Sequence, residues 1–318
     1  MRTRLSRAAR VAAVGLVVTS LVGCSQWSGL KAKMALKDGN TAYAAGDYRK
    51  AIPKYEEALQ LDPTLSQAYF YLANSYDNQW KPARKGETEN DAYLTKAVDF
   101  YKQAAEKSED PKLKKLSLEY LVAAYRDKLE DPSLAEPVVE RMIQMEPNEP
   151  ANYFALSKIY EDAGRYEDAE AALLKARDAK PNDPVVYQQI AGFYNRQGDD
   201  FPKTMENLQK AADLEPNNPQ GFYQVATYYE EKVRKDFRIT PAQRKDYILK
   251  GIEATDKAIA LNADYAEALA YKNILLRHQM RIETDRAKQQ ELEKEADRLR
   301  SKAQELLKKK TTGAARGQ

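Results

Sequence analysis

The sequence predicts an all-α fold built from repeated pairs of antiparallel helices. Apolar residues recur three or four positions apart, which places them on one face of a helix. Glycine and proline are sparse, with 13 and 14 among 318 residues, while alanine, leucine, lysine and glutamate are abundant. That composition favours helices over strands. One such helix pair cannot bury its apolar face alone, so neighbouring pairs must stack on each other.

The clearest unit spans residues 150–183. Its helix faces, its turn and its end are marked by Tyr153, Leu156, Ser157, Tyr160, Gly164, Tyr166, Ala169, Leu173, Ala176 and Pro181. This pattern resembles the tetratricopeptide repeat, a helix pair of about 34 residues. The resemblance implies a right-handed superhelical solenoid of antiparallel helix pairs. Here the solenoid is expected to end in a long C-terminal helix.

About six repeats are expected over residues 34–265, with insertions between paired helices near residues 78–91 and 232–246. In the second insertion, Thr240 and Pro241 are typical of a helix N-cap and first turn, so the two flanking helices should outreach their neighbours. Residues 266–310 contain no glycine or proline, which predicts one long capping helix. Residues 311–318 should form a frayed tail.

The predicted capping helix carries a narrow apolar seam of Leu292, Leu299 and Leu306, spaced seven residues apart. Three outcomes are consistent with this seam. It docks on the preceding repeats, it remains solvated, or it pairs with a second copy of the chain. The last outcome would make the protein a self-assembling homo-oligomer.

The N-terminus reads as an export signal in residues 1–23. Four arginines precede the apolar stretch from Val11 to Val22, which is shorter than a membrane-spanning helix of about 20 residues. The following Leu21-Val22-Gly23-Cys24 resembles the bacterial lipobox, in which the cysteine is lipidated after cleavage. Cys24 is the only cysteine in the chain. The resemblance implies a lipoprotein at the outer membrane, facing the periplasm, with residues 24–33 as a tether.

Cleavage at this point changes the charge of the protein. Residues 1–23 contain four arginines and no acid, so the formal charge falls from +3 to about −1. The basic balance of the whole chain therefore does not indicate a nucleic-acid partner. A single cysteine also excludes an internal disulfide.

No catalytic constellation is apparent, and we expect no enzymatic activity, no metal and no cofactor beyond the covalent lipid on Cys24. The single histidine, His278, is interpreted as a solvated helix residue. There is no glycine-rich phosphate loop. Most signature residues are already assigned to helix packing, so function must come from the surface.

The family resemblance places certain first-helix positions on a concave face that binds protein or peptide partners. These positions are Leu36, Asn40, Tyr43, Phe70, Asn74, Asp77, Phe154, Lys158, Glu161, Gln188, Gly192, Asn195, Tyr223, Thr227 and Glu230. Aromatic rings beside charged and amide groups suit peptide binding. The alternative is that these side chains pack between helices.

The second insertion is rich in basic residues, including Arg234, Lys235 and Arg238. This pattern predicts a docking site for an acidic partner or for lipid headgroups. The alternative is a solvated extension of two helices.

These observations together predict a non-enzymatic, lipid-anchored scaffold for protein–protein interactions at the periplasmic side of a bacterial envelope. The architecture is similar to that of repeat lipoproteins in envelope assembly, pilus biogenesis or secretion. The repeat motif does not choose among these roles. The self-assembling protein that pairs through its C-terminal helix is the alternative.

Overall fold

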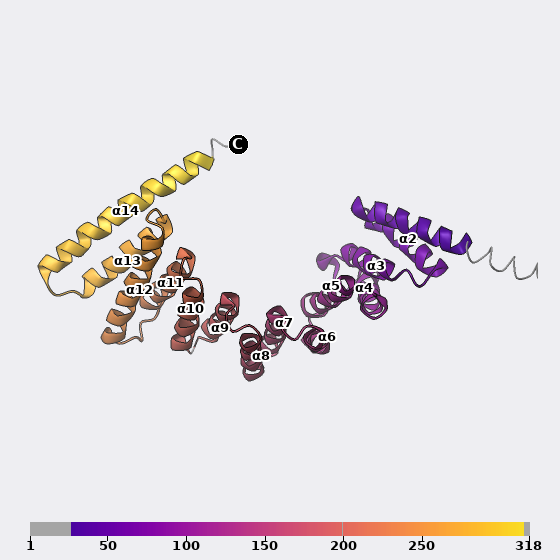
Figure 1. Cartoon of the computed structure of the whole chain (residues 1–318), viewed down its shortest axis with the longest axis horizontal. Coiled ribbons are helices and arrows are strands. Elements are labelled where there is room, and N and C mark those ends of the chain that lie inside the picture. Colours follow the sequence, from indigo (N-terminus) through magenta and orange to yellow (C-terminus); the bar gives the residue numbers. More distant parts are fainter. Residues whose placement is uncertain (1–26, 199, 315–318) are drawn as a thin grey trace, which may run out of the picture. The chain divides into compact units, whose positions relative to one another are not determined.

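A computed structural model describes residues 27–198 and 200–314 as helices joined by short turns (Figure 1), with no strand among them. The signal segment and Cys24 lie outside these residues, as does the end of the predicted tail. The chain divides into two compact units. The first comprises the residues up to 147 together with 158–165, and the second comprises 148–157 and the residues from 166 onward. The all-α fold of helix pairs is confirmed.

The first unit begins with a helix over residues 27–44. It continues with α2 (Tyr48–Leu61), α3 (Ser66–Gln79), the 3₁₀ turn η1 (Pro82–Arg84), α4 (Thr88–Lys107), α5 (Pro111–Ala123), the π-helical turn η2 (Ala124–Lys128) and α6 (Pro132–Met145). The helix α7 (Pro150–Asp162) contributes to both units.

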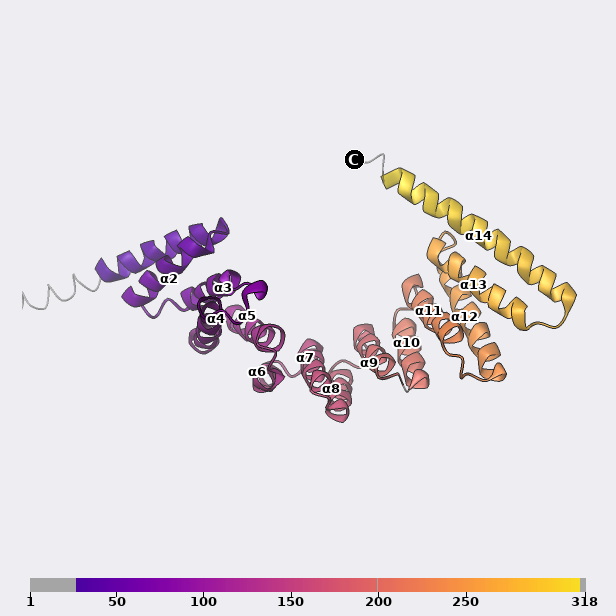
Figure 2. The same cartoon turned by 180° about the vertical axis from the view of Figure 1, so that it is seen from behind.

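The second unit consists of α8 (Tyr166–Ala179), α9 (Pro184–Gln197), α10 (Phe201–Leu214), α11 (Pro219–Lys235), α12 (Pro241–Leu261), α13 (Ala266–Ile282) and α14 (Arg286–Ala314). Successive helices from α9 to α12 run in opposite directions, as the view from behind also shows (Figure 2). The turn after α9 depends on Gly198, whose φ of 78° lies in the left-handed region that glycine adopts without strain.

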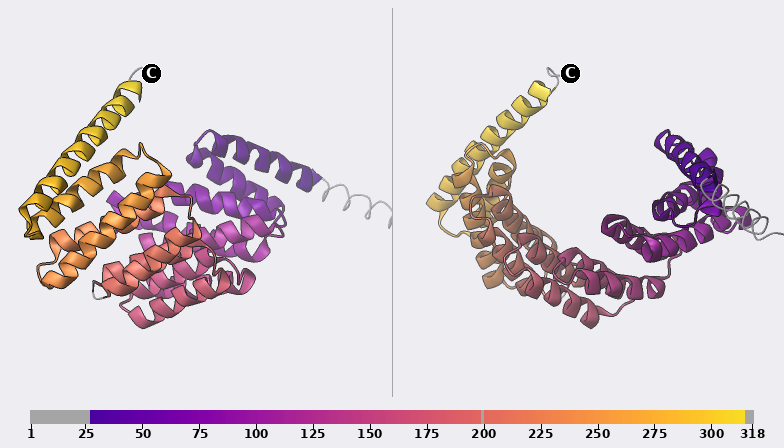
Figure 3. Two further views of the ribbon diagram at one scale, coloured as in Figure 1. Left: turned by 60° about the vertical axis from the view of Figure 1, so that its left-hand side comes forward. Right: turned by 45° about the vertical axis from the view of Figure 1, so that its right-hand side comes forward.

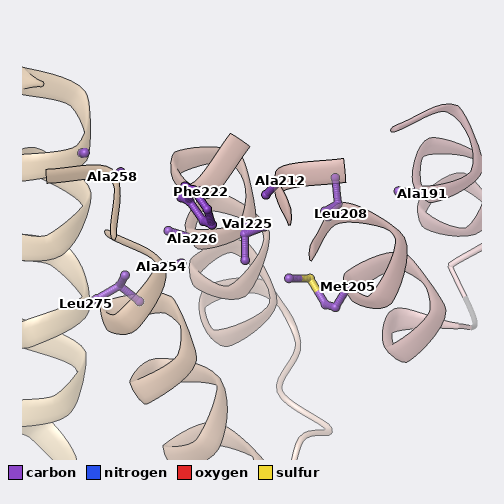
Figure 4. Packing of buried hydrophobic residues seen from close by; sticks show 11 residues of the cluster. Ala191, Met205, Leu208, Ala212, Phe222, Val225, Ala226, Ala254, Ala258 and Leu275 are labelled. Atoms are coloured by element: carbon purple, nitrogen blue, oxygen red, sulfur yellow. The ribbon is translucent and has the colours of Figure 1, made fainter. Parts of the chain in front are cut away.

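Small residues let paired helices approach closely, as the repeat pattern predicts. A Cβ atom at Gly39 would lie 2.8 Å from the ring of Tyr55, which is fully buried. In the second unit, alanines alternate with larger apolar side chains in one core that joins α9 to α13 (Figure 4). That core contains Ala191, Met205, Leu208, Ala212, Phe222, Val225, Ala226, Ala254, Ala258, Ala268 and Leu275. Burial of this surface drives the stacking of the pairs.

The second insertion has the predicted form. The helices α11 and α12 contain 17 and 21 residues, against 14 in each of α9 and α10. Thr240 caps α12 in a reciprocal capping box with Gln243, and Pro241 begins the helix. Residues 236–240 form the connecting turn. The insertion therefore lengthens a helix pair without adding a separate domain.

The expectation of one capping helix over residues 266–310 is wrong. The chain turns at residues 283–285, between α13 and α14. The Glu283 carboxylate accepts hydrogen bonds from the backbone amides of Thr284 and Asp285, and the Asp285 side chain accepts one from Ala287 N at 2.8 Å. Side-chain hydrogen bonds thus shape the turn, and Asp285 caps the start of α14, without glycine or proline.

The apolar seam of α14 docks on α13, and the two helices lie next to each other at the C-terminal end of the second unit (Figure 3). Ala296, Leu299 and Ala303 are buried against Leu269 and Leu276. The docking alternative is therefore confirmed, and the observation that suggested pairing with a second copy has an explanation within the chain.

The tether predicted over residues 24–33 is too long, because the chain is already helical at residue 27, the first residue that the structure describes. Ala32 is fully buried, and the Ser28 hydroxyl donates a hydrogen bond to the carbonyl of Leu61 at 3.2 Å. Residues 27–33 therefore pack on α2 as part of the first repeat. Among the described residues, no helix is long and apolar enough to cross a membrane.

Candidate functional site

In the first unit, several predicted surface positions form a polar network that joins three helices. The Tyr43 hydroxyl donates a hydrogen bond to Asn74 Oδ1 at 2.8 Å, and the Asn74 amide nitrogen donates to the Tyr101 hydroxyl at 3.1 Å. Asn40 is exposed, yet its side-chain oxygen accepts a hydrogen bond from Tyr55 at 2.9 Å. These contacts align neighbouring repeats.

Three further predicted positions of this unit are buried. Phe70 is 4% exposed and lies edge-on to Tyr120, with ring centroids 5.7 Å apart. Asp77 is 9% exposed and forms an ion pair with Lys128. Leu36 is buried as well. In this unit the packing alternative describes Phe70, Asn74 and Asp77.

The predicted positions on α7 are separate from any cavity described below. Phe154 is half-buried, and Lys158 is exposed with its ammonium group paired to Asp162. Glu161 is half-buried, and its backbone carbonyl accepts a hydrogen bond from Gly164. On α9, Gln188 is half-buried and Asn195 is exposed.

In the second unit, the predicted α11 positions line a cavity of about 490 Å³ that we call the tyrosine cavity. Its lining is Gln220, Tyr223, Gln224, Thr227, Tyr228, Glu230, Glu231, Arg234 and Tyr271. Residues three and four apart on α11 supply eight of these nine side chains, because they share one helix face. Only Tyr271 comes from another helix, α13.

Aromatic contacts fix two tyrosines of this cavity, Tyr223 and Tyr271. Tyr223 contacts Tyr265 and Tyr271, with ring centroids 5.2 and 5.3 Å apart. Burial, followed by the neighbouring Tyr271 and Tyr265, raises the pKa of Tyr223 to about 12. Its hydroxyl therefore stays protonated at neutral pH and can donate a hydrogen bond.

The floor of the tyrosine cavity holds a buried carboxylate. Glu230 is 4% exposed, and its Oε1 lies 3.2 Å from Arg234 Nε and 3.5 Å from His278 Nε2. The predicted interpretation of His278 as a solvated residue is wrong, since only 17% of its side chain is exposed. Burial lowers the pKa of His278, although the nearby Glu230 acts in the opposite direction.

A second cavity, of about 600 Å³, lies beside the turn between α11 and α12, and we call it the Phe237 cavity. Tyr194, Asn195, Gly198, Phe201, Thr204, Tyr228, Glu231, Lys232, Lys235, Asp236, Phe237 and Arg238 line it. Asn195, Lys235 and Arg238 were predicted as site residues. The cavity therefore unites a predicted first-helix position with the basic insertion.

The three basic residues predicted as site residues, Arg234, Lys235 and Arg238, each have an acidic partner. Arg234 pairs with Glu230, and Lys235 pairs with Glu231. Arg238 Nε lies 3.0 Å from the Asp236 carboxylate. The insertion is thus less strongly basic than its sequence indicates.

The two cavities adjoin, because Tyr228 and Glu231 line both. Sequence reasoning missed these two residues together with Phe237 and Tyr271. Tyr271 belongs to the following repeat, so only the stacking of repeats brings it to α11. Phe237 was signalled by its position, as the one aromatic residue among the charged residues 230–238.

The described residues contain no group of three or more His, Cys, Asp and Glu side chains arranged to hold a metal ion. The adjoining cavities are lined by aromatic rings, amide groups and paired charges on a continuous surface. Such a lining can bind an extended segment of another protein by side-chain insertion and hydrogen bonding.

Comparison with known families supports the repeat assignment. A family model described as "TPR repeat" matches residues 39–79, and one described as "Tetratricopeptide repeat" matches residues 128–191. These two segments are therefore tetratricopeptide repeats, as predicted. Proteins built from this repeat commonly bind other proteins. No curated protein matches the chain.

Several solved structures are similar to this chain. The C-terminal part of a TPR repeat-containing protein from Cytophaga hutchinsonii is 18% identical, covers 86% of this chain and 99% of its own, and has a TM-score of 0.53. MamA is 18% identical over 67% of this chain and 100% of its own, with a TM-score of 0.45. YrrB, described as a TPR protein with an unusual peptide-binding site, is 19% identical over 60% and 89%, with a TM-score of 0.41.

Proposed function

We propose that this chain is a non-enzymatic scaffold, anchored by lipid to a bacterial envelope, that binds other proteins on the periplasmic side. One observation carries the proposal. The α11 positions that the repeat register selects line the tyrosine cavity, and this cavity adjoins a second one across Tyr228 and Glu231. A partner segment would lie along α11 and place side chains in both cavities.

The side chains of this surface are fixed before a partner arrives. Ring contacts hold Tyr223, and the Thr227 hydroxyl donates to the carbonyl of Gln224 at 2.7 Å. Ordering a flexible side chain on binding costs about 0.5–1.5 kcal/mol, so fixed side chains favour affinity. Tyrosine is also enriched among the residues that dominate protein interfaces.

The anchor rests on the lipobox-like sequence around Cys24, supported by the position of the first helix. The chain is already helical at residue 27, three residues after Cys24, so an acyl chain on Cys24 would hold the repeats close to the bilayer. Growth with labelled palmitate tests this part of the proposal. Label should remain on the wild-type protein and be absent from Cys24→Ala; label on both proteins, or on neither, would contradict the anchor.

Crosslinked capture of the anchored protein from membranes tests the binding surface. Gln224→Arg would place a long charged side chain in the tyrosine cavity, whereas Gln189→Arg places the same side chain on an exposed site of α9 outside both linings. We expect a discrete set of captured proteins that is lost with Gln224→Arg and retained with Gln189→Arg. Equal capture by both variants would place the partner surface elsewhere.

A further inference from the structure

Phe237 is an unusual surface residue. It is 88% exposed, the highest exposure among the described large apolar side chains. It lies in the turn between α11 and α12 and lines the Phe237 cavity. Burying an aromatic ring away from water lowers the free energy of a protein. The exposure of Phe237 therefore requires a structural explanation.

The turn that carries Phe237 is fixed by its own hydrogen bonds. The Asp236 carboxylate accepts from the Arg238 backbone amide at 2.9 Å and from Arg238 Nε at 3.0 Å. The Arg244 guanidinium donates to the carbonyl of Val233 at 2.6 Å and to that of Asp236 at 3.3 Å. These bonds connect both ends of the turn to the helices. The backbone conformation of the turn therefore keeps the Phe237 side chain exposed.

Two further aromatic residues of the lining, Tyr194 and Phe201, are fixed by their own contacts. The Tyr194 hydroxyl donates to Glu170 Oε1 at 2.5 Å, and Tyr194 is itself 8% exposed. Phe201 packs on Tyr247, with ring centroids 5.1 Å apart, and Lys232 Nζ lies 5.0 Å above the Phe201 ring. A space of about 600 Å³ between these rings and Phe237 can hold one or two apolar side chains.

The charges around the cavity select the flanking residues of a ligand. Three cations, Lys232, Lys235 and Arg238, share the two carboxylates of Glu231 and Asp236. The lining thus carries one positive charge in excess. Arg238 has a side-chain exposure of 85%, so its guanidinium group is accessible to a carboxylate of a ligand.

We propose that the Phe237 cavity binds a segment of a partner protein in which an apolar side chain, best an aromatic one, is flanked by acidic residues. The apolar side chain would fill the space between Phe237, Phe201 and Tyr194, and the acidic residues would meet Lys235 and Arg238. This inference rests on the proposed scaffold function and adds the chemistry of the ligand.

A protein segment fits this site better than an anionic membrane surface does. Phe237 lines a cavity of about 600 Å³ together with Tyr194 and Phe201, and a planar bilayer would leave that cavity empty.

Fluorescence anisotropy with the full chain in detergent tests the inference. Three labelled hexapeptides are compared: one with a central phenylalanine pair flanked by aspartates, one with the same pair flanked by lysines, and one with alanines between aspartates. The first should bind most tightly.

Phe237→Ala should weaken its binding about tenfold, as for loss of one aromatic anchor, and Lys235→Gln should weaken it less. Leu249→Ala, at a residue 44% exposed on α12 outside the cavity, should bind normally.

Equal affinity for the three peptides, no binding, or an unaltered Phe237→Ala variant would overturn the inference. Vesicles of phosphatidylglycerol provide the competing outcome. If Phe237→Ala weakens binding to these vesicles and leaves peptide binding unchanged, the residue serves a membrane and the inference is wrong. Membrane capture that still depends on Gln224 would show that the scaffold proposal survives such a result.

Discussion

Buried polar side chains connect neighbouring repeats at the scale of single residues. Asn74 accepts a hydrogen bond from Tyr43 and donates one to Tyr101, so one amide joins three helices. The family register identifies Asn74 as a surface position, and it is 5% exposed. Sequence periodicity finds the helix face correctly and cannot reveal how far the next helix covers it.

Close packing at Gly39 gives a residue-scale prediction. Alanine is the better helix former by about 1 kcal/mol, yet a Cβ atom here would lie 2.8 Å from the ring of Tyr55. Because the ring is fully buried, it has little room to move, and overpacking costs about 1–3 kcal/mol. Urea unfolding should show Gly39→Ala destabilised.

The matched control is Gly192→Ala on α9, where the nearest atom is the mobile end of the Arg196 side chain at 3.3 Å. This variant should be neutral or slightly more stable. A Gly39→Ala protein as stable as wild type would mean that the helix pair is looser than described.

The environment of His278 predicts a dependence of stability on pH. Burial lowers its pKa in the folded protein, so the unfolded chain binds more protons near pH 6 and stability falls as the pH falls. His278→Gln removes this contribution. Unfolding free energies measured between about pH 7 and about pH 5 should therefore shift in favour of His278→Gln as acid is added. A constant difference between the two proteins would contradict the assigned environment.

At the scale of helices, starts and turns differ in how readily sequence reveals them. Thr240 and Pro241 mark the start of α12 because they carry a standard N-cap pattern. The turn between α13 and α14 uses Glu283 and Asp285, which are common in exposed helices. Its sequence therefore looks helical, and the break was missed.

That turn supplies an element-scale prediction. Asp285→Ala removes the side chain that accepts a hydrogen bond from Ala287 N, and loss of such a cap costs about 0.5–2 kcal/mol. Thr284→Ala is the control, since that side chain is exposed and caps nothing in the described structure. Thermal unfolding should show a lower midpoint for Asp285→Ala alone; equal midpoints would argue for a continuous helix.

At the scale of the whole molecule, the repeat architecture was predictable and the partner surface only partly so. Tyr223, Thr227 and Glu230 line a cavity as the register predicts. Phe237 was missed because it lies in a turn outside the repeat pattern, and Phe70 is covered by packing from other helices. The sequence predicts which face of a helix a residue lies on. Whether another helix covers that face depends on the assembled fold.

The seam of α14 distinguishes docking from self-assembly. Leu299 is 5% exposed against α13, so Leu299→Ala should cost about 2–5 kcal/mol of stability. Leu307→Ala, at a residue 39% exposed, should cost much less. Light scattering should give the same mass for both variants and the wild type. A Leu299→Ala protein of half the mass and unchanged stability would favour pairing through α14.

Binding along α11 is the central claim, and photocrosslinking tests it most directly. A photoreactive amino acid is placed at Thr227 in the tyrosine cavity, or at the exposed Gln189 on α9, in the full-length protein in its own membranes. We expect a discrete protein adduct from position 227 and none from position 189. Adducts from position 189 alone, or equal adducts from both, would contradict it.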